Sequence, residues 1–191
     1  MDDRLLTLPN ILTGLRIVLI PPLLALFYVP AAWAAWAAAA VFVVAAVTDF
    51  FDGYLARRRQ VVSLWGRLFD PIADKMLVAA ALMALVAFGR VGGIHILAAV
   101  IILLREILIS GLREFLAGAE AKGIPVTPLA KWKTTVQMAA IAMLIVGQAG
   151  PGGPGFVTAG LVGLWLAAAL TVITGWQYMA AGLRQIRTKR Q

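Results

Sequence analysis

The sequence predicts an all-α membrane protein whose chain crosses the bilayer as six helices. Hydrophobic residues make up 62% of its 191 residues, more than the core of a soluble protein of this length can bury. The apolar runs are also long enough to span a bilayer, which takes about 20 residues for each helix. A polytopic membrane protein is therefore expected.

The six transmembrane helices are predicted at residues 8–28, 31–56, 68–88, 93–116, 130–148 and 156–183. Proline, glycine and charged residues mark the breaks between them, at Pro30, Arg57 to Arg59, Gly89 to Gly93, residues 117–129 and the external turn Gly150 to Gly155. The first helix is expected to be retained, because Met1-Asp-Asp-Arg4 is barely basic and no small-residue cleavage site follows it. Short connections make residues 1–191 a single domain.

Basic residues are distributed unevenly between the two sides of the membrane. Six crossings place both termini on one side, together with twelve basic residues: Arg4, Arg57, Arg58, Arg59, Arg67, Lys122, Lys131, Lys133, Arg184, Arg187, Lys189 and Arg190. The loops of the opposite side contain Arg90 alone. Since basic loops stay inside, both termini and both larger loops are expected on the cytoplasmic side of the cell (inner) membrane.

The net charge of +8 raises nucleic acid as a partner, but the basic residues lie at helix ends rather than on a soluble module. Anionic membrane lipid and a phosphorylated substrate fit this distribution better. The basic tail after Arg184 is interpreted as a topology anchor. The absence of cysteine excludes disulfides and thiolate chemistry.

Four aspartates, Asp49, Asp52, Asp70 and Asp74, lie in otherwise apolar surroundings near the cytoplasmic ends of the second and third predicted helices. Their spacings of three and four residues put each pair on one helix face. The short loop between the helices makes them antiparallel neighbours, so the two pairs can face each other at one depth. Because each carboxylate costs roughly 2.5–3.5 kcal/mol at the centre of a membrane helix, a compensating metal ion is expected.

A cluster of carboxylates with no histidine or cysteine nearby favours Mg²⁺ or Mn²⁺ over zinc. Four carboxylates can hold two ions about 3.5–4 Å apart, an arrangement that suits phosphoryl transfer. The ions would neutralise a diphosphate, and a carboxylate left partly uncoordinated could take a proton from an attacking hydroxyl.

Small residues and a proline surround these aspartates. Gly53, Ala56 and Gly66 either let a ligand approach the backbone closely or serve ordinary helix packing. Pro71 lacks an N–H, so it either opens the third helix after Asp70 or distorts a helix that begins near Gly66. The earlier start is favoured, because it brings Gly66 and both aspartates along one side.

The aspartates belong to a longer pattern, D-x2-D-G-x2-A-R-x8-G-x3-D-x3-D. The pattern is complete here, at Asp49, Asp52, Gly53, Ala56, Arg57, Gly66, Asp70 and Asp74. In this pattern the chain resembles the CDP-alcohol phosphotransferase family. The resemblance implies a six-helix membrane fold, usually a homodimer, which moves a phosphatidyl-type group from a CDP-linked donor onto an alcohol and releases CMP.

The resemblance also implies residue roles. Asp49, Asp52 and Asp70 would be metal ligands, and Asp74 would be the base as well as a ligand of the second ion. The nucleotide and the diphosphate would bind at Gly53, Ala56, Arg57 and Gly66. From the residues alone, Asn10 and Thr13 could contact the nucleotide or cap the first helix, and capping is favoured for Asn10 only.

Three further segments are similar to those family members that make phosphatidylglycerol phosphate. They are Leu8 to Arg16, Arg105 to Arg113, and Lys131 to Met138. With them the likeness covers most of the chain. One departure is Ala130, where that group has glycine, and it affects only the expected local backbone geometry.

The basic residues of these segments are interpreted as a site for the phosphate of the acceptor. Arg105 lies deep in the fourth helix and needs an anion, which could be Glu106, a motif aspartate or a substrate phosphate. Glu106 is expected to be a poor partner, because adjacent residues project roughly 100° apart on a helix. Arg113, Lys131 and Lys133 lie on the same membrane side and could receive a phosphate dianion with it. A structural ion pair for Arg105 and plain topology charges for the lysines remain the alternatives.

The hypothesis that follows is transfer of the phosphatidyl group of CDP-diacylglycerol to glycerol 3-phosphate, with Asp74 as base. Within the family, the alternative acceptors are an inositol phosphate and phosphatidylglycerol. From another class, a divalent-cation transporter could also use buried carboxylates, but it predicts them near the midplane with openings on both sides.

Overall fold

The structure is a computed structural model that describes the backbone of residues 8–59, 64–118 and 128–188. Side chains are described at residues 13–48, 72–73, 75–116, 129 and 132–184. All regular elements in these ranges are helices and none is a strand. The all-α prediction is therefore confirmed for the described part of the chain.

Within the described residues, seven α-helices and one short 3₁₀-helix follow one another: α1 (Leu8–Val18), α2 (Ile20–Phe27), α3 (Ala32–Arg59), α4 (Leu64–Ala87), α5 (His95–Gly118), α6 (Pro128–Val146), η1 (Gly147–Ala149) and α7 (Pro154–Thr188). Each predicted span corresponds to one α-helix, except that the first is divided into α1 and α2. The predicted helix order is thus correct.

The division of the first span occurs at Leu19, two residues before the first of two consecutive prolines. Pro21 and Pro22 lie in the first turn of α2. They lack the amide hydrogens that would bond the carbonyls of Ile17 and Val18 in a continuous helix. Prolines are tolerated in a first helical turn, where these amides have no partner in any case, so the chain begins a new helix here.

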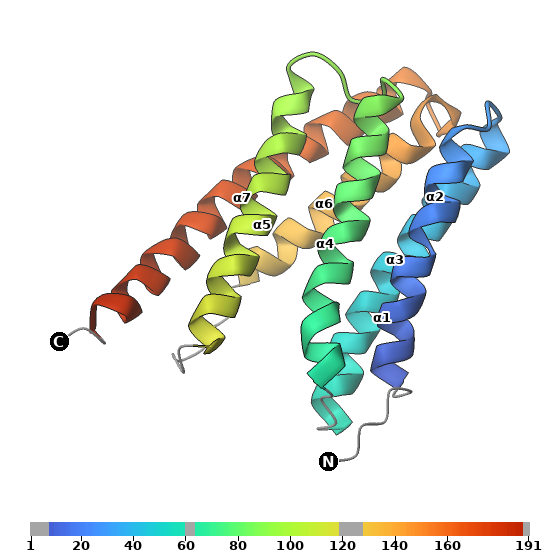
Figure 1. The fold of residues 1–191 in the computed structure, drawn as a ribbon. Coiled ribbons are helices and arrows are strands. Elements are labelled where there is room, and N and C mark those ends of the chain that lie inside the picture. Colours follow the sequence, from blue (N-terminus) through green and yellow to red (C-terminus); the bar gives the residue numbers. More distant parts are fainter. Residues whose placement is uncertain (1–7, 60–63, 119–127, 189–191) are drawn as a thin grey trace.

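The helix ends gather at two opposite sides of the molecule. The start of α1, the end of α3, the start of α4 and the end of α5 lie at one side, at the bottom of Figure 1. The connections at residues 28–31, 88–94 and 147–153 lie at the other side. Arg90 is thereby separated from the helix ends that carry the other basic loops, as the charge distribution predicts.

Two helical stretches of the described residues are long and apolar enough to cross a membrane, His95–Leu116 and Pro154–Arg184. The apolar stretches Thr13–Phe27, Ala32–Thr48 and Lys75–Ala87 are shorter. Large apolar side chains, among them Leu104, Ile107 and Leu108 of α5, are exposed, as a lipid-facing surface requires. Six membrane crossings remain a prediction.

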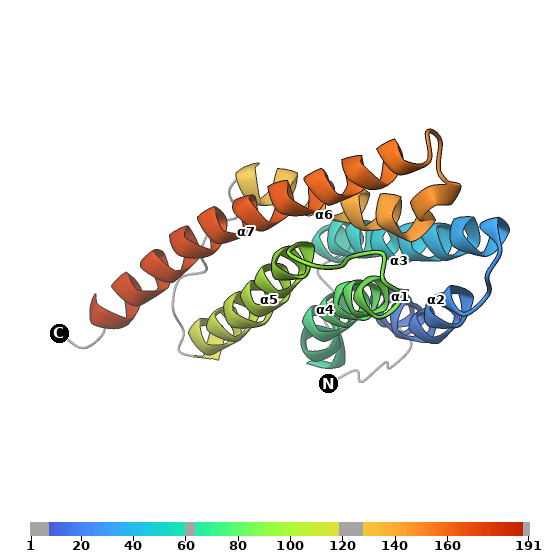
Figure 2. The same cartoon turned by 90° about the horizontal axis from the view of Figure 1, so that it is seen from above.

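α6 and α7 pack closely and cross the bundle at an oblique angle, which is clearest from above (Figure 2). A Cβ at Gly160 would lie 2.9 Å from Leu144 Cγ, and one at Gly163 would lie 3.0 Å from Ala140 Cβ. Only residues as small as glycine allow this approach. α7 also contacts α5, so its position relative to both helices is fixed.

Candidate active site

The motif aspartates lie on two adjacent helices. Asp49 and Asp52 belong to α3, and Asp70 and Asp74 belong to α4; the two helices contact each other and run antiparallel (Figure 1). α4 begins at Leu64, which confirms a start before the proline that follows Asp70. The side chains of all four aspartates lie outside the described residues, so their convergence on metal ions stays a prediction.

The candidate nucleotide residues are placed on three helices: Asn10 and Thr13 on α1, Gly53, Ala56 and Arg57 on α3, and Gly66 on α4. Of these, only Thr13 has its side chain among those described, and that side chain is buried. α1 contacts both α3 and α4. The backbone arrangement therefore brings the three candidate segments next to one another.

Arg16 is a buried cation that the motif pattern does not reveal. It lies on α1 one turn beyond Thr13 and is only 1% exposed. A guanidinium inside a helix bundle needs anionic or polar partners, and α1 packs against the two helices that carry the aspartates. A charge in the middle of the predicted span 8–28 is the signal that the sequence offers for this residue.

Glu106 on α5 is the centre of a group of basic side chains. Lys133 of α6 forms a close ion pair with Glu106 Oε1, and Lys75 Nζ of α4 lies 3.8 Å from Oε2. Arg105 Nη1 lies 3.5 Å from Oε1. Three positive charges and one negative charge leave this group at +2, so it attracts a further anion.

The contact between Arg105 and Glu106 is weak, as expected, although the two side chains do meet. The roughly 100° between adjacent helix positions does not separate them, because both side chains are long enough to turn toward each other. The contact lies at the long limit of a hydrogen bond, however, and Lys133 is the closer partner. Arg105 is thus only partly neutralised by Glu106.

The second arginine of α5, Arg113, lies on the same side of the helix as Arg105 and is exposed. Its Nη2 donates a hydrogen bond of 3.0 Å to the hydroxyl of Tyr178. Arg105 Nη2 donates one of 2.9 Å to Thr174 Oγ1. Both acceptors belong to α7, and neither was among the residues predicted from the sequence.

A small cavity of about 40 Å³ adjoins the ion pair, lined by Lys75, Val78, Glu106, Lys133, Thr134, Gln137 and Met138. It is large enough for about one water molecule. Gln137 is 2% exposed, and its Oε1 has no hydrogen-bond partner among the described residues. An amide oxygen left open beside charged groups is typical of a site completed by a ligand or water.

The structure thus brings Arg105, Arg113 and Lys133 of the predicted acceptor site into one neighbourhood. The side chain of Lys131 lies outside the described residues. No cluster of three or more potential metal ligands occurs among the described side chains.

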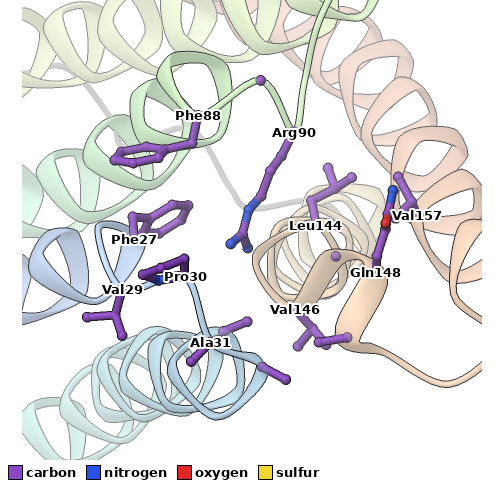
Figure 3. A pocket seen from close by; sticks show the side chains of 15 residues that line it. Phe27, Val29, Pro30, Ala31, Phe88, Arg90, Leu144, Val146, Gln148 and Val157 are labelled. Atoms are coloured by element: carbon purple, nitrogen blue, oxygen red, sulfur yellow. The ribbon is translucent and has the colours of Figure 1, made fainter.

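A larger cavity, of about 740 Å³, lies at the opposite side of the molecule. Arg90 extends into it between Phe27 and Leu144 (Figure 3). Its guanidinium donates a hydrogen bond to the Ile145 carbonyl, and its Cζ lies 4.9 Å from the centroid of the Phe27 ring. Burial lowers the pKa of Arg90 below its ordinary value. α6 ends at Val146, so the Ile145 carbonyl has no hydrogen-bond partner within the helix. Arg90 supplies that partner, and its positive charge is favourable at a helix C-terminus.

Comparison with known sequences identifies the pattern independently. The sequence model of the CDP-alcohol phosphatidyltransferase family matches residues 6–173. This match covers the aspartate motif and all of the basic side chains around Glu106.

Several curated proteins are similar over most of their length. A protein of Rickettsia typhi is 47% identical, over 91% of this chain and 96% of its own. One of Cereibacter sphaeroides is 41% identical, over 96% and 99% respectively. Both are named CDP-diacylglycerol--glycerol-3-phosphate 3-phosphatidyltransferase. A cardiolipin synthase (CMP-forming) of Oryza sativa is 37% identical, over 92% of this chain and 57% of its own.

Proposed function

The chain belongs to the CDP-alcohol phosphatidyltransferase family, and we propose that it transfers the phosphatidyl group of CDP-diacylglycerol to glycerol 3-phosphate. The products are phosphatidylglycerol phosphate and CMP. The names of the relatives favour glycerol 3-phosphate over an inositol phosphate or phosphatidylglycerol as acceptor. They also favour a transferase over a cation transporter.

The observation that carries this proposal is the link between the basic group and the aspartate motif. Lys75 directly follows Asp74 in the sequence, and its Nζ lies 3.8 Å from Glu106 Oε2. The group around Glu106 therefore lies next to the part of α4 that carries the proposed base. An acceptor whose phosphate is held by Arg105 and Lys133 can present its hydroxyl in that direction.

In the proposed acceptor site, Arg105, Arg113, Lys131 and Lys133 bind the phosphate of glycerol 3-phosphate. Arginine and lysine donors form charge-assisted hydrogen bonds to phosphate oxygens. Lys133 carries three N–H donors, so its pair with Glu106 leaves donors for a ligand. The +2 charge of the group suits a phosphate dianion and disfavours an uncharged acceptor.

The reaction proposed is a displacement at the phosphorus that bears the lipid. Asp74 takes the proton of the acceptor hydroxyl, the freed oxygen forms a bond to that phosphorus, and the bond to the CMP oxygen breaks. Asn10, Thr13, Gly53, Ala56, Arg57 and Gly66 hold the nucleotide and diphosphate of the donor. Positioning of the two substrates supplies a large part of the acceleration.

A divalent metal fits the donor set, because four carboxylate positions on α3 and α4 offer only hard oxygen ligands. Asp49, Asp52, Asp70 and Asp74 would hold two ions, Mg²⁺ or Mn²⁺. When bound, such ions neutralise the diphosphate and polarise its phosphorus.

The proposed setting is a six-helix homodimer in the cell (inner) membrane, with both termini and the active site cytoplasmic. Two apolar helices among the described residues and the family assignment support the membrane location. Anionic lipid then surrounds the basic loops, and nucleic acid is not a partner.

The test is an assay of the purified protein in detergent with CDP-diacylglycerol and Mg²⁺, which follows CMP release. Glycerol 3-phosphate, an inositol phosphate, phosphatidylglycerol and no acceptor are compared, and mass spectrometry identifies the lipid product. CMP release together with phosphatidylglycerol phosphate is expected only with glycerol 3-phosphate. Release with another acceptor alone, or with none, would overturn the proposed function.

A further inference from the structure

One face of α7 holds both arginines of α5. Thr174 and Tyr178 lie four residues apart, so they share this face one turn from each other. Both are buried, and the whole Tyr178 residue is only 2% exposed. Gly175 lies beside them, and a Cβ there would be 3.1 Å from Arg105 Cγ. The absence of a side chain at this position lets Arg105 lie directly against the α7 backbone.

Tyr178 contacts both arginines. Its hydroxyl accepts a hydrogen bond of 3.0 Å from Arg113 Nη2. Arg113 Cζ lies 4.7 Å from the centroid of its ring, and Arg105 Cζ lies 6.0 Å from the same centroid. Both distances are within the range of cation–π attraction. One tyrosine therefore fixes two guanidinium groups that would otherwise repel each other.

Thr174 supports Arg105 from the next turn. Its hydroxyl donates to the carbonyl of Leu170 at 2.8 Å, which uses its one proton. The oxygen is then oriented as an acceptor, and Arg105 Nη2 donates to it at 2.9 Å. The orientation of Arg105 is thus set by a residue whose own orientation is fixed by the helix backbone.

The chemical nature of these partners matters. Tyrosine and threonine hydroxyls orient a guanidinium but leave its charge in place, whereas a carboxylate would neutralise it. Arg113 uses one of its five N–H donors on Tyr178 and is exposed, so donors remain for a ligand. Fixing a flexible arginine before the ligand arrives lowers the conformational entropy that binding must remove.

We propose that Tyr178 is a positioning residue of the acceptor site: it holds Arg105 and Arg113 in the orientation that binds the acceptor's phosphate, without neutralising either. This role rests on the proposed function, because it takes the two arginines as phosphate ligands. Tyr178 does not touch the reacting atoms. It acts through the arginines, so its effect falls on acceptor binding and not on the chemical step.

The experiment compares Tyr178→Phe and Tyr178→Leu with the unaltered protein in the CMP-release assay. Tyr178→Phe loses the hydrogen bond to Arg113 and keeps the ring, and we expect KM for glycerol 3-phosphate to rise about tenfold. Tyr178→Leu loses both contacts, and a larger rise is expected. In both variants kcat and KM for CDP-diacylglycerol should stay within about twofold. Trp176→Leu, at a 75% exposed position of the same helix, is the matched control and should change nothing.

A second comparison shows whether Tyr178 acts through Arg113. In an Arg113→Met protein, adding Tyr178→Phe should raise KM for glycerol 3-phosphate no further, because the contact is already absent. Thr174→Val should reproduce the selective rise in KM through Arg105, and it provides an independent variant if Tyr178→Leu does not fold.

The outcomes separate the two proposals. If the unaltered protein uses glycerol 3-phosphate but KM for glycerol 3-phosphate is unchanged in Tyr178→Phe and in Thr174→Val, the positioning role is wrong and the proposed function stands. A fall in kcat with unchanged KM also overturns the role. So does a rise in KM for glycerol 3-phosphate that is as large when Tyr178→Phe is added to the Arg113→Met protein as when it is added to the unaltered protein. If the unaltered protein shows no release dependent on glycerol 3-phosphate, the proposed function fails and the positioning role fails with it.

Discussion

Lys133 on α6 and Glu106 on α5 form an ion pair in which the lysine is buried and the glutamate side chain is 13% exposed. The pair joins two helices whose intervening residues 119–127 lie outside the described structure. It also leaves the carboxylate within reach of Lys75 and Arg105. One carboxylate thus stabilises three cations that the proposed acceptor site uses or adjoins.

The first prediction concerns the stability that Glu106 provides. Glu106→Ala leaves Lys133 buried without this counter-charge, and we expect a loss of about 3–5 kcal/mol in the free energy of unfolding. The double variant with Lys133→Met should recover most of this loss, because no buried charge remains at that position. Thermal unfolding in detergent measures both. Glu114→Ala, an exposed carboxylate on the same helix, should change stability by less than about 0.5 kcal/mol; an equal loss there would contradict the argument.

The second prediction concerns the opposite side of the molecule. Arg90→Met removes the hydrogen bond to the Ile145 carbonyl and the contact with the Phe27 ring. Removal of a buried charge offsets part of this, so the expected loss of stability is about 1–2 kcal/mol. KM and kcat of the folded protein should not change, because the variant is far from the motif. Arg90→Lys keeps the charge and should lose less; altered kinetics in either variant would contradict a purely structural role.

Much of the fold could be predicted from the sequence, because apolar runs and their breaks determine where a membrane helix begins and ends. The break at Leu19 differs from the prediction, which places both prolines inside one continuous span, although proline in a first helical turn favours a new helix. The early start of α4 was predicted correctly, because only a helix that includes Gly66 aligns it with the two aspartates that follow.

The candidate site could be predicted only in part. Arg105, Arg113 and Lys133 carry charges that stand out in apolar helices, so the sequence reveals them. Their partners Thr174 and Tyr178 are ordinary residues of an apolar helix, and only the packing of α7 on α5 brings them to the arginines. Sequence spacing describes one helix at a time and cannot give the register between two.

The third prediction concerns the metal ions. Removal of divalent ions with EDTA should abolish CMP release, and Mg²⁺ or Mn²⁺ should restore it, because four acidic groups next to a diphosphate need a positive charge. Binding should also be visible without substrates, as a rise in unfolding temperature with Mg²⁺ concentration. Asp49→Asn should weaken that rise. Full activity in EDTA would exclude the metal-dependent mechanism.

The fourth prediction concerns the base. Asp74→Asn keeps the size and polarity of the side chain but cannot accept the hydroxyl proton, and we expect kcat to fall about 10²- to 10⁴-fold. The unfolding temperature measured without divalent ions should change little. Asp3→Asn, an aspartate outside the motif, is the control. Near-normal turnover by a folded Asp74→Asn protein would show that another group takes the proton.

The fifth prediction uses the close approach of Arg105 to α7. Gly175→Ala places a Cβ 3.1 Å from Arg105 Cγ and 3.3 Å from its Nε, which is tighter than an ordinary contact. The arginine must shift, and its hydrogen bond to Thr174 weakens. Because the side chain is flexible, the fold should tolerate the change, with an unfolding temperature that falls only slightly. If Arg105 binds the acceptor's phosphate, KM for glycerol 3-phosphate should rise several-fold, on the order of the effect of one weakened hydrogen bond.

Gly155→Ala is the matched control for this variant, since it lies on the same helix and a Cβ there would meet nothing within 4 Å. Gly175 lies in the interior of α7, where glycine to alanine gains about 1 kcal/mol of helix propensity, whereas Gly155 lies in its first turn and gains less. The contact with Arg105 is therefore read from KM and not from stability. Steady-state kinetics with varied glycerol 3-phosphate at saturating CDP-diacylglycerol separate the cases. A rise in KM confined to Gly175→Ala supports phosphate binding by Arg105, whereas unchanged KM with a lower unfolding temperature assigns this arginine to a structural ion pair with Glu106.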